Sequence, residues 1–105
     1  MKMHGNQWRS KLAGYGKRGH IRVNPKVPKT MTVGKKRISV RSRLIRHERV
    51  ERKLREGKGY RGRFKGQKLS YHSAHRRALK EEERGLTYHQ VETYNGKLGN
   101  IARNS

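Results

Sequence analysis

The chain has 105 residues, and its 29 Lys and Arg against 7 Asp and Glu give a formal net charge of +22 at pH 7. The hydrophobic fraction of 30% is enough for one small core, so a single domain is expected. The absence of cysteine excludes disulfides and thiolate metal sites, and no apolar run approaches the roughly 18 residues of a membrane-spanning helix. So large a charge repels itself in a compact body, which favours a polyanionic partner.

Residues 1–19 predict an extended basic arm. They show neither the period of a strand nor that of a helix and contain several glycines, so their expected anchors are Trp8, Leu12 and Tyr15. We expect this arm to be followed by one small α+β domain over residues 20–105.

Short antiparallel strands are expected after the arm. The segments "HIRV" (20–23) and "MTVGKKRISV" (31–40) are rich in β-branched residues and predict two or three strands. Pro25 and Pro28 lie between these segments and favour a stiff, extended connection.

Two helices are expected in the middle of the chain. Residues 42–56 carry an apolar stripe of Leu44, Val50 and Leu54, and Gly57 is a good C-terminal stop. On the same helix, Glu48 with Arg52 and Glu51 with Arg55 have the i,i+4 spacing of ion pairs. A second helix is expected from a Ser70 or Ser73 N-cap to Arg84, with Gly85 after it.

The last segment, "LTYHQVETYNGKLGNIA" (86–102), predicts a hairpin. Its side chains alternate with a period of two, and Asn95-Gly96 fits a type I′ turn. The expected fold is therefore α+β: a small single domain with two helices, short antiparallel strands including this C-terminal hairpin, and an extended basic N-terminal arm.

The segment "GKGYRGRFKGQK" (57–68) combines a cation at every second or third position with two aromatic residues. Cations at this spacing match successive phosphates, the glycines permit close approach, and Tyr60 and Phe64 offer faces for stacking of unpaired bases. The alternative is a solvated loop whose two rings hold it to the core.

The remaining candidate contacts are cations in acid-poor stretches of the arm, the strand region and the arginine-rich face of the first helix. The predicted nucleic-acid-binding residues are Lys17, Arg18, Lys35, Lys36, Arg37, Arg41, Arg43, Arg46, Arg49, Lys58, Tyr60, Arg61, Arg63, Phe64, Lys65 and Lys68.

The histidines are the candidates for metal binding and for acid–base catalysis, the alternatives to nucleic-acid binding. His72 and His75 have i,i+3 spacing on the second predicted helix, but no cysteine or obviously placed carboxylate completes a zinc site, so no metal is expected. No cofactor is expected either, because the chain has no phosphate-binding glycine loop, GxSxG or HExxH motif. His89 and Glu92 are candidates for a base and an acid, although alternation would put them on opposite faces of a strand.

These features predict a non-catalytic nucleic-acid-binding protein, with structured RNA favoured and a ribosomal or other ribonucleoprotein component as the expected role. Acid-free segments with scattered glycines suit burial in folded RNA, and no helix carries a recognisable DNA-reading motif. The alternatives are a DNA-coating or nucleoid-type protein, a regulatory or phage-encoded protein that docks on an acidic protein surface, and a small basic nuclease. An intracellular, cytoplasmic location is expected, with mitochondrial or nucleoid-associated locations as alternatives, and the oligomeric state is open.

Overall fold

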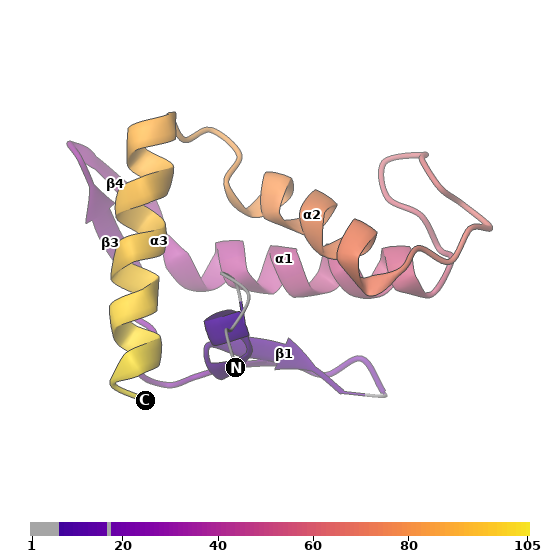
Figure 1. Ribbon diagram of the computed structural model, residues 1–105, viewed down its shortest axis with the longest axis horizontal. Helices are drawn as coiled ribbons and strands as arrows, with labels where there is room; N and C mark the ends of the chain where they lie inside the picture. Colours follow the sequence, from indigo (N-terminus) through magenta and orange to yellow (C-terminus); the bar gives the residue numbers. More distant parts are fainter. Residues whose placement is uncertain (1–6, 17) are drawn as a thin grey trace.

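A computed structural model describes residues 7–16 and 18–105, and these residues form an α+β fold of helices and two antiparallel sheets (Figure 1). In chain order the elements are η1 (Gln7–Lys11, a 3-10 helix), β1 (Ala13–Tyr15), β2 (Ile21–Val23), β3 (Thr30–Val33), β4 (Lys36–Ser39), α1 (Val40–Arg55), α2 (Tyr71–Glu82) and α3 (Tyr88–Arg103). The α+β class expected from the sequence is thus confirmed at this level.

The two expected helices are present as α1 and α2, which pack side by side (Figure 1). The apolar stripe of α1 is buried, and Val50 and Leu54 meet Ala74 and Ala78 of α2 in one of two hydrophobic clusters. The Ser70 side chain caps α2 by accepting a hydrogen bond from the Ser73 backbone.

The expected C-terminal hairpin is wrong, and so is the expected count of two helices, because residues 88–103 form a third described helix, α3. Thr87 and Gln90 form a capping box at its start. Its buried residues, Tyr94, Leu98 and Ala102, are spaced by four, which is the helical period. Asn95-Gly96 therefore lies inside a helix, and the apparent period of two along this segment has no structural role.

Residues 7–15, expected to belong to an extended arm, form η1 and β1. Leu12 is fully buried in the larger hydrophobic cluster together with Leu44, Tyr94 and Leu98, so this predicted anchor does contact the core. Lys17 lies outside the described residues.

The two sheets are hairpins that flank α1. β1 pairs with β2 so that Ala13 faces Val23 and Tyr15 faces Ile21, and this hairpin packs on α1. β3 pairs with β4 between Thr30–Val33 and Lys36–Ser39, and β3 contacts α3. Among the helices in the described ranges, none combines the length and the apolar character required to cross a membrane.

Candidate functional site

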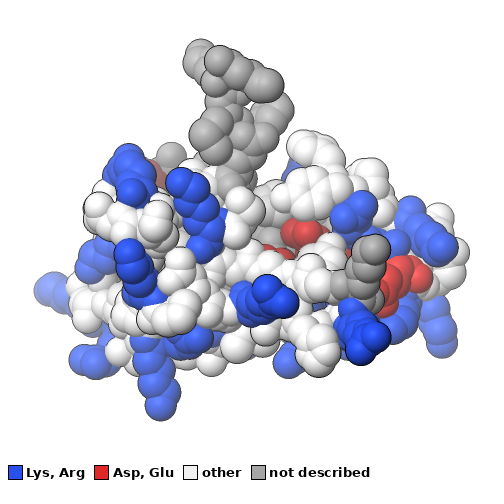
Figure 2. All heavy atoms as spheres, turned by 90° about the horizontal axis from the view of Figure 1, so that it is seen from below, with Lys and Arg blue, Asp and Glu red and all other residues white. Residues whose placement is uncertain are grey.

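The fold separates the two signs of charge. Of the seven acidic residues, Glu48, Glu51 and Glu82 are buried and only Glu56 and Glu92 are exposed. Figure 2 shows Lys and Arg side chains along the left, lower and right margins of one face, whereas acidic residues show in few places. The solvent-facing surface is therefore more basic than the net charge alone implies.

Most of the predicted nucleic-acid-binding cations lie on this surface, in the β3–β4 turn, on the outer side of α1 and in the 57–68 loop. The exposed ones are Arg18, Lys35, Lys36, Arg37, Arg46, Arg49, Lys58, Arg61, Arg63, Lys65 and Lys68.

Three predicted contact residues also bind carbonyl groups of the protein itself. Arg41 donates to the carbonyl of Val27 at 3.0 Å, and Arg43 donates to the carbonyls of Glu82 at 2.7 Å and Arg84 at 2.9 Å. Lys36 is exposed, and its ammonium donates to the Gly85 carbonyl at 3.0 Å. The guanidinium groups of Arg41 and Arg43 thus join segments of the fold through Nη1, and both residues are only partly exposed.

The two aromatic residues of the 57–68 loop pack against the α1–α2 cluster. The Arg77 guanidinium lies 4.2 Å from the centroid of the Phe64 ring, and the Tyr60 hydroxyl donates to Glu81 at 3.5 Å. Backbone hydrogen bonds between Tyr60 and Arg63 close a tight turn. The rings hold the loop to the protein, while the cations of the loop lie on its exposed side.

A second group of polar residues lies between α1 and α2. α1 carries His47 and Glu51 one turn apart on the same face, and α2 presents His75 to them. Glu51 Oε2 lies 3.1 Å from His47 Nε2 and 3.0 Å from His75 Nδ1. The ligand-type atoms of these three residues, the "His-Glu cluster", all lie within 4.8 Å of one another.

A buried carboxylate supports the His-Glu cluster from behind. Glu82 is fully buried, and its Oε1 lies 2.8 Å from His47 Nδ1. Arg9 Nη1 donates to both Glu82 oxygens, at 2.6 and 2.7 Å, and the Tyr94 hydroxyl donates to Oε2 at 2.6 Å. This network joins η1, α1, α2 and α3 around His47.

The charges of this network shift the pKa values of its members. Burial opposes the charged form of His47, but the hydrogen bonds with Glu51 and Glu82 outweigh it and raise the pKa of His47. Burial would likewise raise the pKa of Glu82, yet the hydrogen bond with His47 and the charge of Arg9 lower it. For Glu48, burial dominates over the opposing charge of His47 and raises the pKa to about 7.

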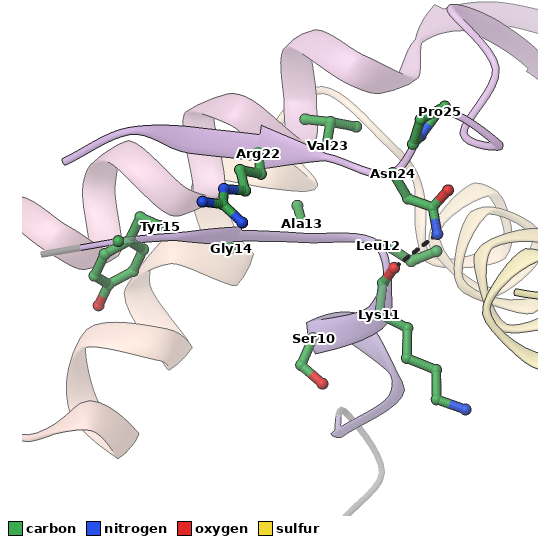
Figure 3. A pocket seen from close by; sticks show the side chains of 11 residues that line it. Ser10, Lys11, Leu12, Ala13, Gly14, Tyr15, Arg22, Val23, Asn24 and Pro25 are labelled. Carbon is green, nitrogen blue, oxygen red and sulfur yellow. Dashed lines mark hydrogen bonds between the residues drawn. The ribbon is translucent and has the colours of Figure 1, made fainter. Parts of the chain in front are cut away.

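A pocket of about 560 Å³ gives access to the His-Glu cluster. It is lined by His47, Glu48, Glu51 and His75, by Arg55 and Tyr71, and on the opposite side by residues of η1 and β1. A larger pocket of about 870 Å³ continues along β1 and shares Ser10, Ala13, Gly14 and Tyr15 with the first (Figure 3).

Sequence reasoning missed this cluster. Its detectable signal is the segment "HERVE" (47–51), which has the spacing of the zinc-binding HExxH motif but carries Glu51 at the second ligand position. His72, which was considered together with His75, is exposed and lies outside the cluster. His89 and Glu92 are exposed on α3, so they are not strand residues.

Comparisons with known proteins add no assignment: no protein-family model matches the chain, and no curated protein or solved structure is similar to it. The chemistry and geometry of the basic surface and of the His-Glu cluster are thus the basis for assigning a function.

Proposed function

We propose that this protein binds nucleic acid, with structured RNA preferred over DNA, as a ribosomal or other ribonucleoprotein component. The observation that carries the proposal is the separation of charge. Three of the seven acids are buried while the loop, the β3–β4 turn and the outer face of α1 present cations to solvent. A surface of this kind attracts phosphate groups, whose release of condensed counterions dominates the binding free energy.

The 57–68 loop is the part of this surface in which exposed cations are carried by a fixed backbone. Arg61, Arg63 and Lys65 are exposed on a loop whose backbone is held by the turn at Tyr60 and by its two packed aromatic rings. Because the loop is ordered before binding, its cations lose less conformational entropy when they contact phosphates. The expected contribution of Tyr60 and Phe64 is consequently to fix the loop rather than to stack on bases.

The test is the salt dependence of binding to a structured RNA hairpin and to a DNA duplex of matching sequence, measured by fluorescence anisotropy. With about 6–10 phosphate contacts, affinity should fall by ~10³–10⁵ between 50 and 200 mM salt. Replacing Arg61, Arg63 and Lys65 by Gln should reduce the slope of log affinity against log salt by roughly 2–3, because each phosphate contact contributes ~0.7–0.9 to it.

Arg41→Gln with Arg43→Gln provides the matched control. These residues carry the same charge but bind carbonyls inside the protein, so their replacement should lower the thermal stability and leave most of the salt slope unchanged. A shallow slope for the unmodified protein would contradict nucleic-acid binding. Equal or tighter binding to the DNA duplex would favour a DNA-coating role, and a partner retained after complete nuclease digestion would favour an acidic protein.

The expected lack of catalysis stays a prediction. Degradation of the RNA or DNA probe by the purified protein, abolished by His89→Ala, would instead support the basic nuclease.

A further inference from the structure

The three ligand-type atoms of the His-Glu cluster lie close enough together for one metal ion to contact all of them. In a tetrahedral site with metal–ligand bonds of about 2.0–2.2 Å, neighbouring ligand atoms lie about 3.3–3.6 Å apart. The separations from Glu51 Oε2 are 3.1 Å to His47 Nε2 and 3.0 Å to His75 Nδ1, a few tenths of an ångström below that range, and all three atoms lie within 4.8 Å of one another. Two imidazoles and one carboxylate are a ligand set typical of a catalytic zinc site.

The surroundings orient the first of these ligands. Glu82 Oε1 lies 2.8 Å from His47 Nδ1, and the other ring nitrogen, Nε2, lies 3.1 Å from Glu51 Oε2. Arg9 and Tyr94 fix Glu82 in turn. A carboxylate behind a histidine is the usual outer partner of a metal-binding imidazole.

The cluster is open on one side. Its three residues line the 560 Å³ pocket, so a metal ion held by them would keep a position that water or a substrate can occupy. Glu48 lines the same pocket beside His47 and is not part of the ligand set. In the sequence it follows His47 directly, as the glutamate that acts as general base follows the first histidine of an HExxH helix.

The opposite wall of the pocket contains a strand edge. Asn24 donates to the Leu12 carbonyl and Gly16 to the His20 carbonyl, which makes Leu12, Gly14 and Gly16 the positions bonded to β2. Ala13 and Tyr15 therefore direct their backbone groups away from β2. β1 lines the larger pocket, shown in Figure 3, and its residues Ala13, Gly14 and Tyr15 also line the pocket of the His-Glu cluster, so an extended peptide that paired with this edge would lie beside the cluster.

We propose that His47, Glu51 and His75 bind one Zn²⁺ ion, and that this centre, with Glu48 and the edge of β1 that is directed away from β2, hydrolyses an extended peptide. The inference goes beyond nucleic-acid binding and does not depend on it, and it stands against the sequence-based expectations of no metal and no catalysis. A Zn²⁺-bound water attacks the peptide carbonyl carbon while Glu48 accepts the proton of the water. The C–N bond breaks, Glu48 passes this proton to the leaving nitrogen, and the products are a carboxylic acid and an amine, which then exchange a proton to give a carboxylate and an ammonium group.

Metal binding is tested first, on the full chain. Protein freed of metal by a chelator and then dialysed is titrated with Zn²⁺ by calorimetry, and one equivalent per chain is expected. Glu51→Gln and His75→Gln should each weaken binding by more than the ~10–100-fold that follows loss of an outer partner of a ligand. The control is His72→Gln, an exposed histidine of the same helix, which should change the affinity less than twofold, or about 0.4 kcal/mol.

Circular dichroism checks that each variant is folded. If the cluster variants do not fold, the visible absorption of the Co²⁺-loaded unmodified protein decides, because a four-coordinate ion absorbs far more strongly than hydrated Co²⁺. An absence of stoichiometric Zn²⁺ binding, or an equal effect of His72→Gln and His75→Gln, would show that the cluster is only an internal ion network.

Hydrolysis is tested with Zn²⁺-loaded protein and a degenerate pool of unstructured peptides, with new amino termini identified by mass spectrometry. Glu48→Gln should retain Zn²⁺ and lose ~10²–10⁴-fold in cleavage rate, as expected for loss of a general base. Glu92→Gln, which neutralises an exposed glutamate, should cleave normally. Stoichiometric Zn²⁺ binding without peptide cleavage would overturn the hydrolytic part of the proposal, and so would metal-dependent cleavage of RNA in place of peptides.

Discussion

Replacing Tyr94 by Phe removes one hydroxyl group from the centre of the molecule. The Tyr94 side chain is fully buried, and its hydroxyl donates to Glu82 Oε2 at 2.6 Å. A hydrogen bond to a charged group contributes about 1.5–3 kcal/mol. Because Arg9 also donates to Glu82 Oε2, the carboxylate oxygen keeps a partner in the variant. We therefore expect the free energy of unfolding to fall by about 2 kcal/mol, in the middle of that range.

Urea denaturation followed by far-UV circular dichroism measures this loss. With a slope of about 1–3 kcal/mol per molar urea, the midpoint should move down by roughly 1 M while the slope stays constant. Tyr88→Phe is the matched control because Tyr88 is 75% exposed, and surface substitutions usually change stability by less than about 0.5 kcal/mol. If Tyr94→Phe unfolds within that margin of the unmodified protein, the buried network does not stabilise the fold as the distances indicate.

Two further predictions concern local backbone structure. Gly59→Ala would bring a Cβ to 2.5 Å from the Arg63 carbonyl oxygen at φ +72°, whereas Gly62→Ala has open space at φ +75°. Both variants should lose ~1–2 kcal/mol of stability because alanine disfavours the left-handed conformation. The close contact should make the drop in melting temperature larger for Gly59→Ala, and equal drops would contradict the tight turn. Thr87→Ala removes the capping box of α3 and should lower the free energy of unfolding, measured by urea denaturation, by ~1 kcal/mol. Thr87→Ser keeps a capping hydroxyl and should retain most of this stability. No loss in the alanine variant would show that packing alone holds α3.

The sequence predicted the elements whose local signals agree with their packing. α1 follows from the stripe of Leu44, Val50 and Leu54, and α2 from its Ser70 cap. The C-terminal segment carries conflicting local signals. Alternation and Asn95-Gly96 favour a hairpin, whereas the capping box of Thr87 and Gln90 favours a helix. Burial of Tyr94 and Leu98 against α1 and the hairpins stabilises the helical alternative, and this tertiary contribution is not encoded in any short window.

The candidate sites differ in the same way. The basic surface follows from composition, because a chain with so few acids exposes cations in almost any fold. The His-Glu cluster requires His75 to meet Glu51 across 24 residues of sequence, and only the packing of α2 on α1 brings them together. The i,i+4 pair expected between Glu48 and Arg52 does not form, since Arg52 binds Glu56 and α1 turns Glu48 and Glu51 inward.

The placement of the acidic residues is itself an argument for a cation site. Each buried charge costs several kcal/mol in desolvation, and well-packed hydrophobic residues are often at least as stabilising as a buried ion pair. At the surface, the same acids would relieve the self-repulsion of a chain with a net charge of +22. All three acids are instead buried: Glu48 and Glu51 line a pocket together with His47, and Glu82 contacts His47 from the interior. Arg9 and Tyr94 offset part of this cost at Glu82, and binding of a divalent cation at His47, Glu51 and His75 would offset the part that falls on Glu51.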